Sequence, residues 1–276
     1  MRPETPFTPG IEVCGEVTAV GDGVPHVSVG DRVIGMAVLP FGGFASHALL
    51  DGALCFPAPA QLDAAEAAAF HVSYQTGWFA LHRRAQLSAG ETVLVHAAAG
   101  GVGTAATQIA KSAGATVIGV VGGEEKADVA RRAGADLVVD RHKYDFVSVT
   151  KEATNGHGAD VVFDPVGGET YMRSTKCIAF EGRIVLIGFA GGAIQSAPLN
   201  HALVKNYSIV GLHWGLYQTR DPGLVRECHD SLIRLLERAA IRPLIGHRLG
   251  FDDIPLGLQA LGSGSSTGRI VYVAAD

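Results

Sequence analysis

The chain has 276 residues, of which 47% are hydrophobic and 18% charged, and its net charge at neutral pH is −5. These values are typical of a soluble globular protein, and a chain of this length is expected to form two domains. The balance of charge leaves no excess of cations to neutralise a phosphate backbone, which excludes nucleic acid as the main partner.

The four cysteines lie far apart in the sequence, at positions 14, 55, 177 and 228, and no two of them form a CxxC pair. This spacing favours neither a disulfide framework nor a cysteine zinc knuckle, and it suits a reducing compartment. The first residues contain no charged segment followed by an apolar one, and no run approaches the ~18 apolar residues of a membrane span. We therefore expect a cytoplasmic protein without a membrane partner.

Residues 1–75 contain short β-type runs separated by glycine and proline turns. The pattern predicts strands at Glu12–Val20, Arg32–Ala37 and Ala45–Leu50, followed by an alanine-rich helix around Asp63–Phe70. We expect this part to be antiparallel and barrel-like.

From residue 92 to residue 213 short β-branched runs alternate with helix-like segments, a pattern that predicts a parallel sheet covered on both faces. The expected strands are Thr92–His96, Thr116–Val121, Asp136–Asp140, Asp160–Asp164, Arg183–Gly188 and Tyr207–Leu212. The helix after the first strand carries one apolar stripe from Val102 to Ala113 and ends before Gly114. The expected fold is α/β, with a doubly wound, six-stranded Rossmann sheet.

The last part of the chain returns to short elements. A helix is expected at Pro222–Ala239, and shorter strand and helix fragments at Arg248–Gly250, Ile254–Leu261 and Arg269–Val273. We predict a discontinuous, mainly β domain of residues 1–75 and 241–276 that flanks a dinucleotide-binding domain of residues 76–240.

The chemistry begins where the strand Thr92–His96 runs directly into glycines and a periodic helix. Gly100 and Gly103 are spaced as in GxxG, and small or apolar residues (Ala97, Ala99, Gly101 and Val102) fill the positions around them. Small residues let the backbone approach a pyrophosphate, which then lies at the positive end of the helix. The alternative is a strand-to-helix turn that merely needs glycine, but the six-strand frame favours a dinucleotide site.

The end of the second strand usually selects the cofactor, because an acid there accepts the ribose 2′-hydroxyl of NAD. Here the strand ends in Val121, Gly122 and Gly123, and the cations Lys126, Arg131, Arg132 and Arg141 follow. We predict NADPH, whose 2′-phosphate needs cations. Glu124 and Glu125 could instead be the NAD acid, although we interpret them as first-turn helix residues, and Lys126 could be a solvated surface lysine.

Several stretches together resemble the quinone oxidoreductase branch of the medium-chain dehydrogenase/reductase superfamily. They are residues 9–17, which read Pro-Gly-Ile-Glu-Val-Cys-Gly-Glu-Val, residues 30–33, 43–48, 90–92, 96–103, 164–168, 187–190 and 267–270. The resemblance covers nearly the whole chain. It implies a GroES-like catalytic domain beside the Rossmann domain and an NADPH:quinone oxidoreductase-like activity.

Zinc-containing members of that superfamily have a ligand histidine after the Pro-Gly pair, where this sequence has Ile11. The sequence also lacks the closely spaced cysteines of the structural zinc lobe, so we expect no metal. His71, His96 and His213 are interpreted as packed or surface residues. Without zinc, hydride transfer must depend on positioning and on an electrophile that delocalises the incoming charge, as a quinone does.

The resemblance also implies positions for the cofactor and the substrate. Thr76 is expected at the cofactor side of the cleft, Val166 and Gly167 near the nicotinamide ribose, and Gly188 and Phe189 near the nicotinamide ring. Relatives often have a tyrosine at the place of Arg141, so the role of Arg141 follows from its charge alone. Tyr74, Trp214 and Tyr217 are candidates for lining the substrate pocket, with packing as the alternative, and no catalytic residue is assigned.

Relatives carry several dozen further residues before the Pro-Gly-Ile-Glu stretch, including an Asn-Pro turn, so we expect an amino-terminally shortened catalytic domain. One alternative function is an NADPH-binding protein or sensor with little turnover. Another is an enoyl-thioester or alkenal reductase of the same superfamily, which the lack of linker-like tails makes weaker. A homodimer through the cofactor domain is expected, with Gly182–Gly192 and Asn206–Gly215 as edge material.

Overall fold

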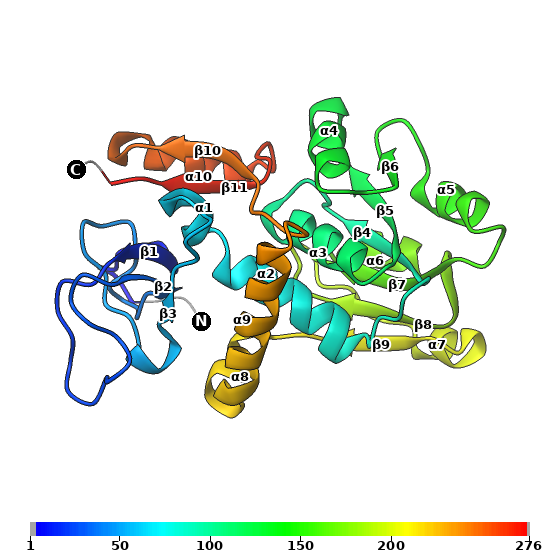
Figure 1. Ribbon diagram of the computed structural model, residues 1–276. Coiled ribbons are helices and arrows are strands. Elements are labelled where there is room, and N and C mark those ends of the chain that lie inside the picture. The colour runs from blue at the N-terminus through cyan, green and yellow to red at the C-terminus, as the bar shows by residue number, and fades with distance from the viewer. Residues whose placement is uncertain (1–3, 275–276) are drawn as a thin grey trace.

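The computed structural model describes residues 4–274, which form two lobes side by side (Figure 1). One lobe contains an antiparallel sheet of β1 (Glu12–Glu16), β2 (Arg32–Met36) and β3 (Phe56–Pro57), in that order. Beside it lies a parallel pair, β10 (Ile245–Leu249) and β11 (Arg269–Tyr272). Figure 1 shows this pair next to α1 (Ala64–Ala68), so the last residues of the chain do return to the first lobe. The exact domain bounds at residues 75 and 241 stay a prediction.

The second lobe is built around one parallel sheet with the strand order β6-β5-β4-β7-β8-β9. The strands are β4 (Thr92–His96), β5 (Thr116–Val121), β6 (Leu137–Asp140), β7 (Ala159–Asp164), β8 (Ile178–Leu186) and β9 (Ser208–Gly211). Val93, Leu94 and Val95 of β4 are fully buried, as expected for a central strand covered on both faces. The predicted doubly wound six-stranded sheet is confirmed.

Helices cover both faces of this sheet, α2 (His71–Trp78) and α9 (Pro222–Glu237) lie between the two lobes, and α1 and α10 (Ile254–Gly262) lie beside β10 and β11 in the first lobe (Figure 1). The helices of both lobes are α1, α2 with the π-helical segment η2 (Phe79–Arg84), α3 (Gly101–Ser112), α4 (Glu124–Arg132), α5 (Phe146–Ala153), α6 (Gly168–Ser174), α7 (Leu199–Lys205), α8 (Gly215–Arg220), α9 and α10, with short 3₁₀ turns at η1 (Gly52–Leu54) and η3 (Phe251–Asp253). Within residues 4–274 no helix combines the length and the apolar character needed to cross a bilayer.

The prediction of a strand at Ala45–Leu50 was wrong. Only Leu50 forms a β-bridge, to Ala37. Gly43 and Phe44, just before this segment, bond to residues 9–10 near the start of the chain: Gly43 N–H donates to the Gly10 carbonyl at 2.6 Å, and Phe44 N–H donates to the Pro9 carbonyl at 3.0 Å. The backbone of Gly43 and Phe44 is therefore not available to add a strand to the sheet, which has the three strands β1, β2 and β3.

Two segments pass between the lobes and are tied to each other. Asp63 and Glu66 form a reciprocal capping box that starts α1. Glu66 then accepts two hydrogen bonds from Arg242, at 2.6 and 2.7 Å, and the Arg242 backbone is held by the Gln108 side chain of α3. These bonds fix the return of the chain after α9 against α1 and α3.

Two buried histidines lie in the core between the lobes. The His229 ring stacks on Phe56 with centroids 4.4 Å apart, and the His71 ring meets Trp214 edge to face. Burial lowers the pKa of His71 to about 3 and that of His229 to about 4. Both rings are therefore neutral in the folded protein near neutral pH.

Because these two histidines are buried in their neutral form, we expect the free energy of unfolding to decrease in mild acid. An unfolded histidine binds a proton below pH ~6.5, whereas His229 stays neutral in the fold until about pH 4. Unfolding is therefore increasingly favoured as pH falls through this window, by about 2 kcal/mol for each histidine at pH 5. His229→Phe keeps the stacked ring and removes the titration, so urea unfolding of this variant should lose less stability between pH 8 and pH 5 than the wild type. Identical pH profiles for the two proteins would contradict the assignment.

Candidate active site

The turn between β4 and α3 brings the predicted glycines together at the amino end of a helix. Gly100 is the N-cap of α3, and its N–H donates to the Ala97 carbonyl at 2.9 Å. A Cβ at Gly103 would lie 2.2 Å from that same carbonyl oxygen, so this position admits only glycine. The first amides of α3 have no acceptor within the helix and are oriented to bind an anion.

His96 lies at the end of β4 but not in the site. The ring is fully buried, its Nε2 is 2.7 Å from Ser174 Oγ, and it packs edge to face against Phe146. Burial lowers the pKa of His96 to about 3. As predicted, His96 and His71 are packed residues, and His213 is exposed on the surface.

The turn after β5 is the second part of the site. Gly123 adopts a φ of +94°, and its N–H donates to Asp140 Oδ1 at 3.0 Å. The side chains of Arg141 and His142 lie over Gly122. Lys126, predicted to face the same place, instead donates to the Gly264 carbonyl of the C-terminal turn.

The acids and the other cations after β5 pair with each other on the surface. Glu124 and Glu125 stand in the first turn of α4, as interpreted from the sequence. Glu124 binds Arg131 at 3.0 Å and Lys143 at 3.5 Å. Arg131 is further occupied by Asp128 at 2.6 Å, so Glu124 and Arg131 do not face Gly122 as free charges.

The loops after β7 and β8 pack onto each other and bring four predicted residues together. Asp164 at the end of β7 accepts from the N–H groups of Val166 and Gly167, both at 2.9 Å. Phe189 packs against Gly167, where a Cβ would lie 2.6 Å from its ring. Gly188 directly precedes Phe189, so the two loops form one wall at the carboxyl edge of the sheet.

Arg269 and Glu12 also lie in this region, although neither residue was predicted to have a role there. The side chain of Arg269 covers Gly101, where a Cβ would lie 2.2 Å from its Cδ. Its guanidinium donates to the buried Glu12 carboxylate at 2.5 Å. Gly268 N–H also donates to the Ala99 carbonyl at 2.7 Å. The stretch 267–270 was visible as family-like, but nothing local to it shows that its arginine pairs with a carboxylate 257 positions away.

The three aromatic pocket candidates lie mainly in packing contacts. Tyr74 is buried and donates to Gln108 at 2.7 Å, and Trp214 is buried and donates to Gln75 at 3.1 Å. The Tyr217 ring packs on Phe79 with centroids 4.3 Å apart. Their contacts correspond to the packing alternative.

Thr76 is the predicted cofactor residue that comes from a lobe-crossing helix. Its side chain is buried on α2, which packs against α3 through Gly77. A Cβ at Gly77 would lie 2.9 Å from Ile109 Cδ1, so the two helices approach closely.

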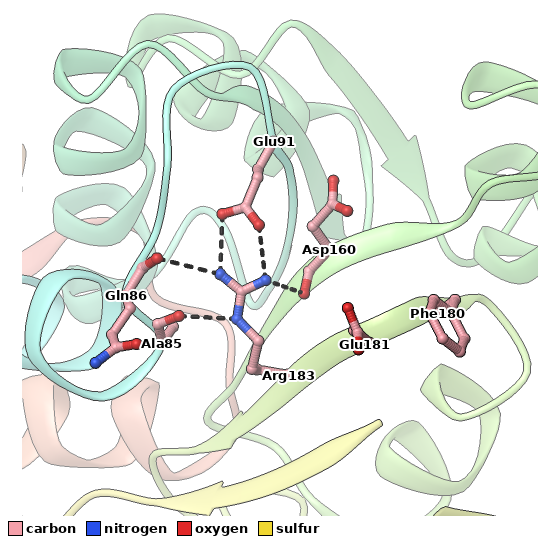
Figure 2. Close-up of a pocket in the computed structure, with 7 residues that line it drawn as sticks. All are labelled: Ala85, Gln86, Glu91, Asp160, Phe180, Glu181 and Arg183. Carbon is pink, nitrogen blue, oxygen red and sulfur yellow. Dashed lines mark hydrogen bonds and ion pairs between the residues drawn. The ribbon is translucent and has the colours of Figure 1, made fainter. Parts of the chain in front are cut away.

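A cavity of about 370 Å³ lies near the amino ends of β4, β7 and β8, away from the strand ends that carry the glycine turns. Figure 2 shows the residues that line it. Every nitrogen of the Arg183 guanidinium is engaged there, by Glu91 at 2.7 and 2.9 Å and by the carbonyls of Ala85, Asp160 and Gln86. Arg183 therefore stabilises the start of the strands. This cavity lies away from the glycine turns.

Metal ligands do not gather in the part of the chain that the structure describes: no group of three or more His, Cys, Asp or Glu side chains there could hold a metal ion. The four cysteines are unpaired with each other and three of them are buried.

Comparison with known proteins agrees with this architecture. Residues 1–60 match the alcohol dehydrogenase GroES-like domain, and residues 101–230 match the zinc-binding dehydrogenase family. The quinone oxidoreductase-like protein 2 homolog of Nematostella vectensis is 39% identical over 272 residues, which cover 98% of this chain and 74% of the relative. The chain belongs to the quinone oxidoreductase-like enzymes of the medium-chain dehydrogenase/reductase superfamily.

Two further similarities cover nearly all of this chain. The structure of Escherichia coli quinone oxidoreductase complexed with NADPH matches with a TM-score of 0.89 and 30% identity, over 99% of this chain and 84% of that one. A mycocerosic acid synthase-like polyketide synthase of Mycobacterium tuberculosis is 31% identical over 266 residues, which are 95% of this chain but 12% of the synthase.

The Glu12–Arg269 pair predicts a coupling that a double-mutant cycle can measure. Burial raises the pKa of Glu12 although Arg269 opposes this, so removing the cation leaves a carboxylate that is costly to keep ionised. Arg269→Met should reduce the free energy of unfolding by about 2 to 3 kcal/mol at pH 8. The loss should shrink as pH falls, because a protonated Glu12 needs no cation. Adding Glu12→Gln should recover part of the loss, and strictly additive effects would show that the contact carries no coupling.

Proposed function

We propose that this enzyme uses NADPH to reduce a quinone or another conjugated carbonyl compound, and that it does so without zinc. The observation that carries the proposal is the β4–α3 turn, where the first amides of α3 lack a side-chain cap and the side chain of Arg269 lies against Gly101. The NADPH complex of the similar E. coli quinone oxidoreductase supports the choice of cofactor.

The residues present fit a dinucleotide with an extra phosphate. The backbone from Ala99 to Gly103 would hold the pyrophosphate, with Arg269 beside it as a cation. The turn Gly122–Gly123 would receive the adenosine ribose, with Arg141 near its 2′-phosphate and Lys126 at the adjoining C-terminal turn.

The loops after β7 and β8 would position the reacting end of the cofactor. When bound, NADPH supplies the hydride. Val166 and Gly167, with Gly188 and Phe189 opposite, would hold the nicotinamide at the edge of the sheet, while Thr76 approaches from α2. A quinone delocalises the incoming charge over its conjugated carbonyls, so water can protonate the product and no strong protein acid is required.

The ligand atoms of the described residues support the proposal that zinc is not used. Ile11 offers no ligand atom at the position after the Pro-Gly pair. Cys14 and the other cysteines do not combine with histidines into a ligand set in residues 4–274.

An enoyl-thioester substrate is the second candidate, because the chain is similar to a segment of a polyketide synthase. Addition of hydride to a conjugated acceptor is common to both reactions. An NADPH-binding sensor would bind the cofactor equally well but turn over no acceptor.

The activity predicts a defined pattern in cofactor and substrate assays. Purified enzyme should bind NADPH more tightly than NADH and should oxidise NADPH steadily with quinones, without stoichiometric zinc. Gly101→Val should weaken NADPH binding at least about tenfold, because the new side chain displaces Arg269 from the helix end. Gly21→Ala is the matched control, since its Cβ would meet nothing within 4 Å and should change nothing.

Each competing function gives a different result in the same assays. Tighter NADH than NADPH binding would contradict the cofactor. A rate with enoyl thioesters far above that with quinones would favour the reductase of thioesters. NADPH binding without turnover on any acceptor would favour the sensor.

We also propose that two copies associate along the edge strand β9. The expected edge material included Gly182–Gly192, but β8 is paired on both sides, which leaves β9 as the edge on this side of the sheet. The preceding helix α7 exposes Leu203 and Val204, by 78% and 77% of their surfaces. An unpaired edge strand beside exposed apolar residues favours self-association.

This dimer predicts an effect of charge on α7. Leu203→Glu should convert a dimer into a monomer in analytical ultracentrifugation, because the carboxylate would be buried at the contact. Leu256→Glu, at an equally apolar exposed site on α10, should leave the dimer intact. A monomeric wild type at micromolar concentration would exclude the dimer.

A further inference from the structure

The loop that follows β8 folds back over the turn that follows β7. Three backbone hydrogen bonds join the two segments. They run from the N–H groups of Ile187, Ala190 and Gly191 to the carbonyls of Asp164, Pro165 and Val166, at 2.9, 3.0 and 2.9 Å. Up to Gly191, the wall that is proposed to hold the nicotinamide is therefore fixed by backbone bonds alone.

Beyond Gly191 the loop is held differently. Among residues 4–274, the stretch 193–197 makes one hydrogen bond to another part of the protein. In this bond the Gln195 side chain accepts the N–H of Gly168 through Oε1, at 2.8 Å. The neighbouring Ile194 is 78% exposed and provides no comparable contact. Gln195 therefore holds this stretch of the loop on the turn after β7.

The group that Gln195 accepts is the first amide of α6. Gly167, the N-cap of this helix, offers no side chain to receive that amide. Gly167 and Gly168 both have positive φ angles, +70° and +58°, and two consecutive glycines impose little rigidity of their own. Contacts from outside must therefore set the turn. They come from Asp164, which accepts the N–H of Gly167, and from Gln195.

Gln195 and Phe189 pack against the same glycine. A Cβ at Gly167 would lie 2.6 Å from Phe189 Cδ1 and 3.1 Å from Gln195 Oε1. Both contacts involve the turn on which the nicotinamide is proposed to lie. A change at Gln195 would therefore release the Gly168 amide and loosen the packing of Phe189 on Gly167.

We propose that Gln195 is a positioning residue for hydride transfer: by holding Gly168, it fixes the turn after β7 against Phe189 and so orients the nicotinamide. The inference rests on the proposed use of NADPH. It adds to that proposal a residue outside the wall itself, one that acts through Gly167 and Gly168 and not by touching the reacting atoms.

This role affects the rate more than the affinity. The reacting atoms must lie about 3 to 3.5 Å apart, and a misplacement of about 1 Å can slow a reaction by roughly 100-fold. The loss of one neutral hydrogen bond changes an equilibrium by only about 2- to 10-fold. Removing the Gln195 contact should therefore reduce kcat more than it weakens the binding of NADPH.

Two substitutions of Gln195 test the hydrogen bond itself. Gln195→Met keeps the length of the side chain but offers no oxygen to Gly168, whereas Gln195→Glu keeps an acceptor whose charge the amino end of α6 favours. We expect kcat with a quinone to fall about 10- to 100-fold in Gln195→Met and to change less than about threefold in Gln195→Glu. Gln259→Met, at an exposed position of α10, is the matched control and should leave kcat unchanged.

Two further measurements distinguish positioning from a general loss of structure. In calorimetry, NADPH should bind Gln195→Met about 2- to 10-fold more weakly, whereas adenosine 2′,5′-bisphosphate, which lacks the nicotinamide, should bind all variants equally. With NADPH deuterated on one face of C4, the wild type should transfer hydrogen from a single face, and Gln195→Met should lose part of this selectivity. The calorimetric comparison requires no turnover.

Three results would overturn the inference. One is a Gln195→Met enzyme with the kcat and NADPH affinity of the wild type. Another is an equal loss in Gln195→Met and Gln195→Glu, which would show that the hydrogen bond is not what matters. The third is a weaker binding of adenosine 2′,5′-bisphosphate to Gln195→Met, which would indicate a wider structural defect. A wild type that fails to bind NADPH, or binds it without reducing any acceptor, would instead contradict the proposed function.

Discussion

The contact on which this molecule depends is that of Arg269 with Gly101, secured by the buried carboxylate of Glu12. It brings the last strand, the first strand and the helix of the glycine turn to one point. Because Gly101 has no side chain, the stem of Arg269 can lie directly on the start of α3. The GroES-like lobe and the Rossmann lobe therefore share a boundary at the place where the helix dipole is most positive.

The contact with Arg269 also explains why the Glu12 side chain can remain buried. A carboxylate removed from water is costly unless charges and donors compensate it, and here the compensation comes from Arg269 and the N–H of Val72. An anion at the end of α3 would compete with Glu12 for the guanidinium. A pyrophosphate bound there, as proposed, would thus be linked to the electrostatic state of Glu12 through one side chain.

Most of the Rossmann lobe could be predicted from the sequence because its rules are local. The apolar runs of β4 and β5 matched to the residue, and two of the predicted glycines stand where the backbone requires them: a Cβ at Gly103 would lie 2.2 Å from the Ala97 carbonyl oxygen, and Gly123 has a φ of +94°. The first lobe was less predictable: Ala45–Leu50 has the composition of a strand, but its neighbours bond to residues 8–10 instead. The pairing of Glu12 with Arg269 had no local signal at all.

Side-chain roles were harder to predict than positions, and the cations around Gly122 show why. Charge alone placed Lys126 and Arg141 in the site, yet the partner that engages Lys126 is a carbonyl in a turn more than a hundred residues later. His142 carried no signal, because an isolated histidine in a surface turn has no distinctive pattern. Its position follows from Asp140, which bonds to both turns and so sets which two nitrogens face Gly122. The geometry of this turn is therefore determined by the acid that bonds to its backbone as much as by the basic side chains that lie over it.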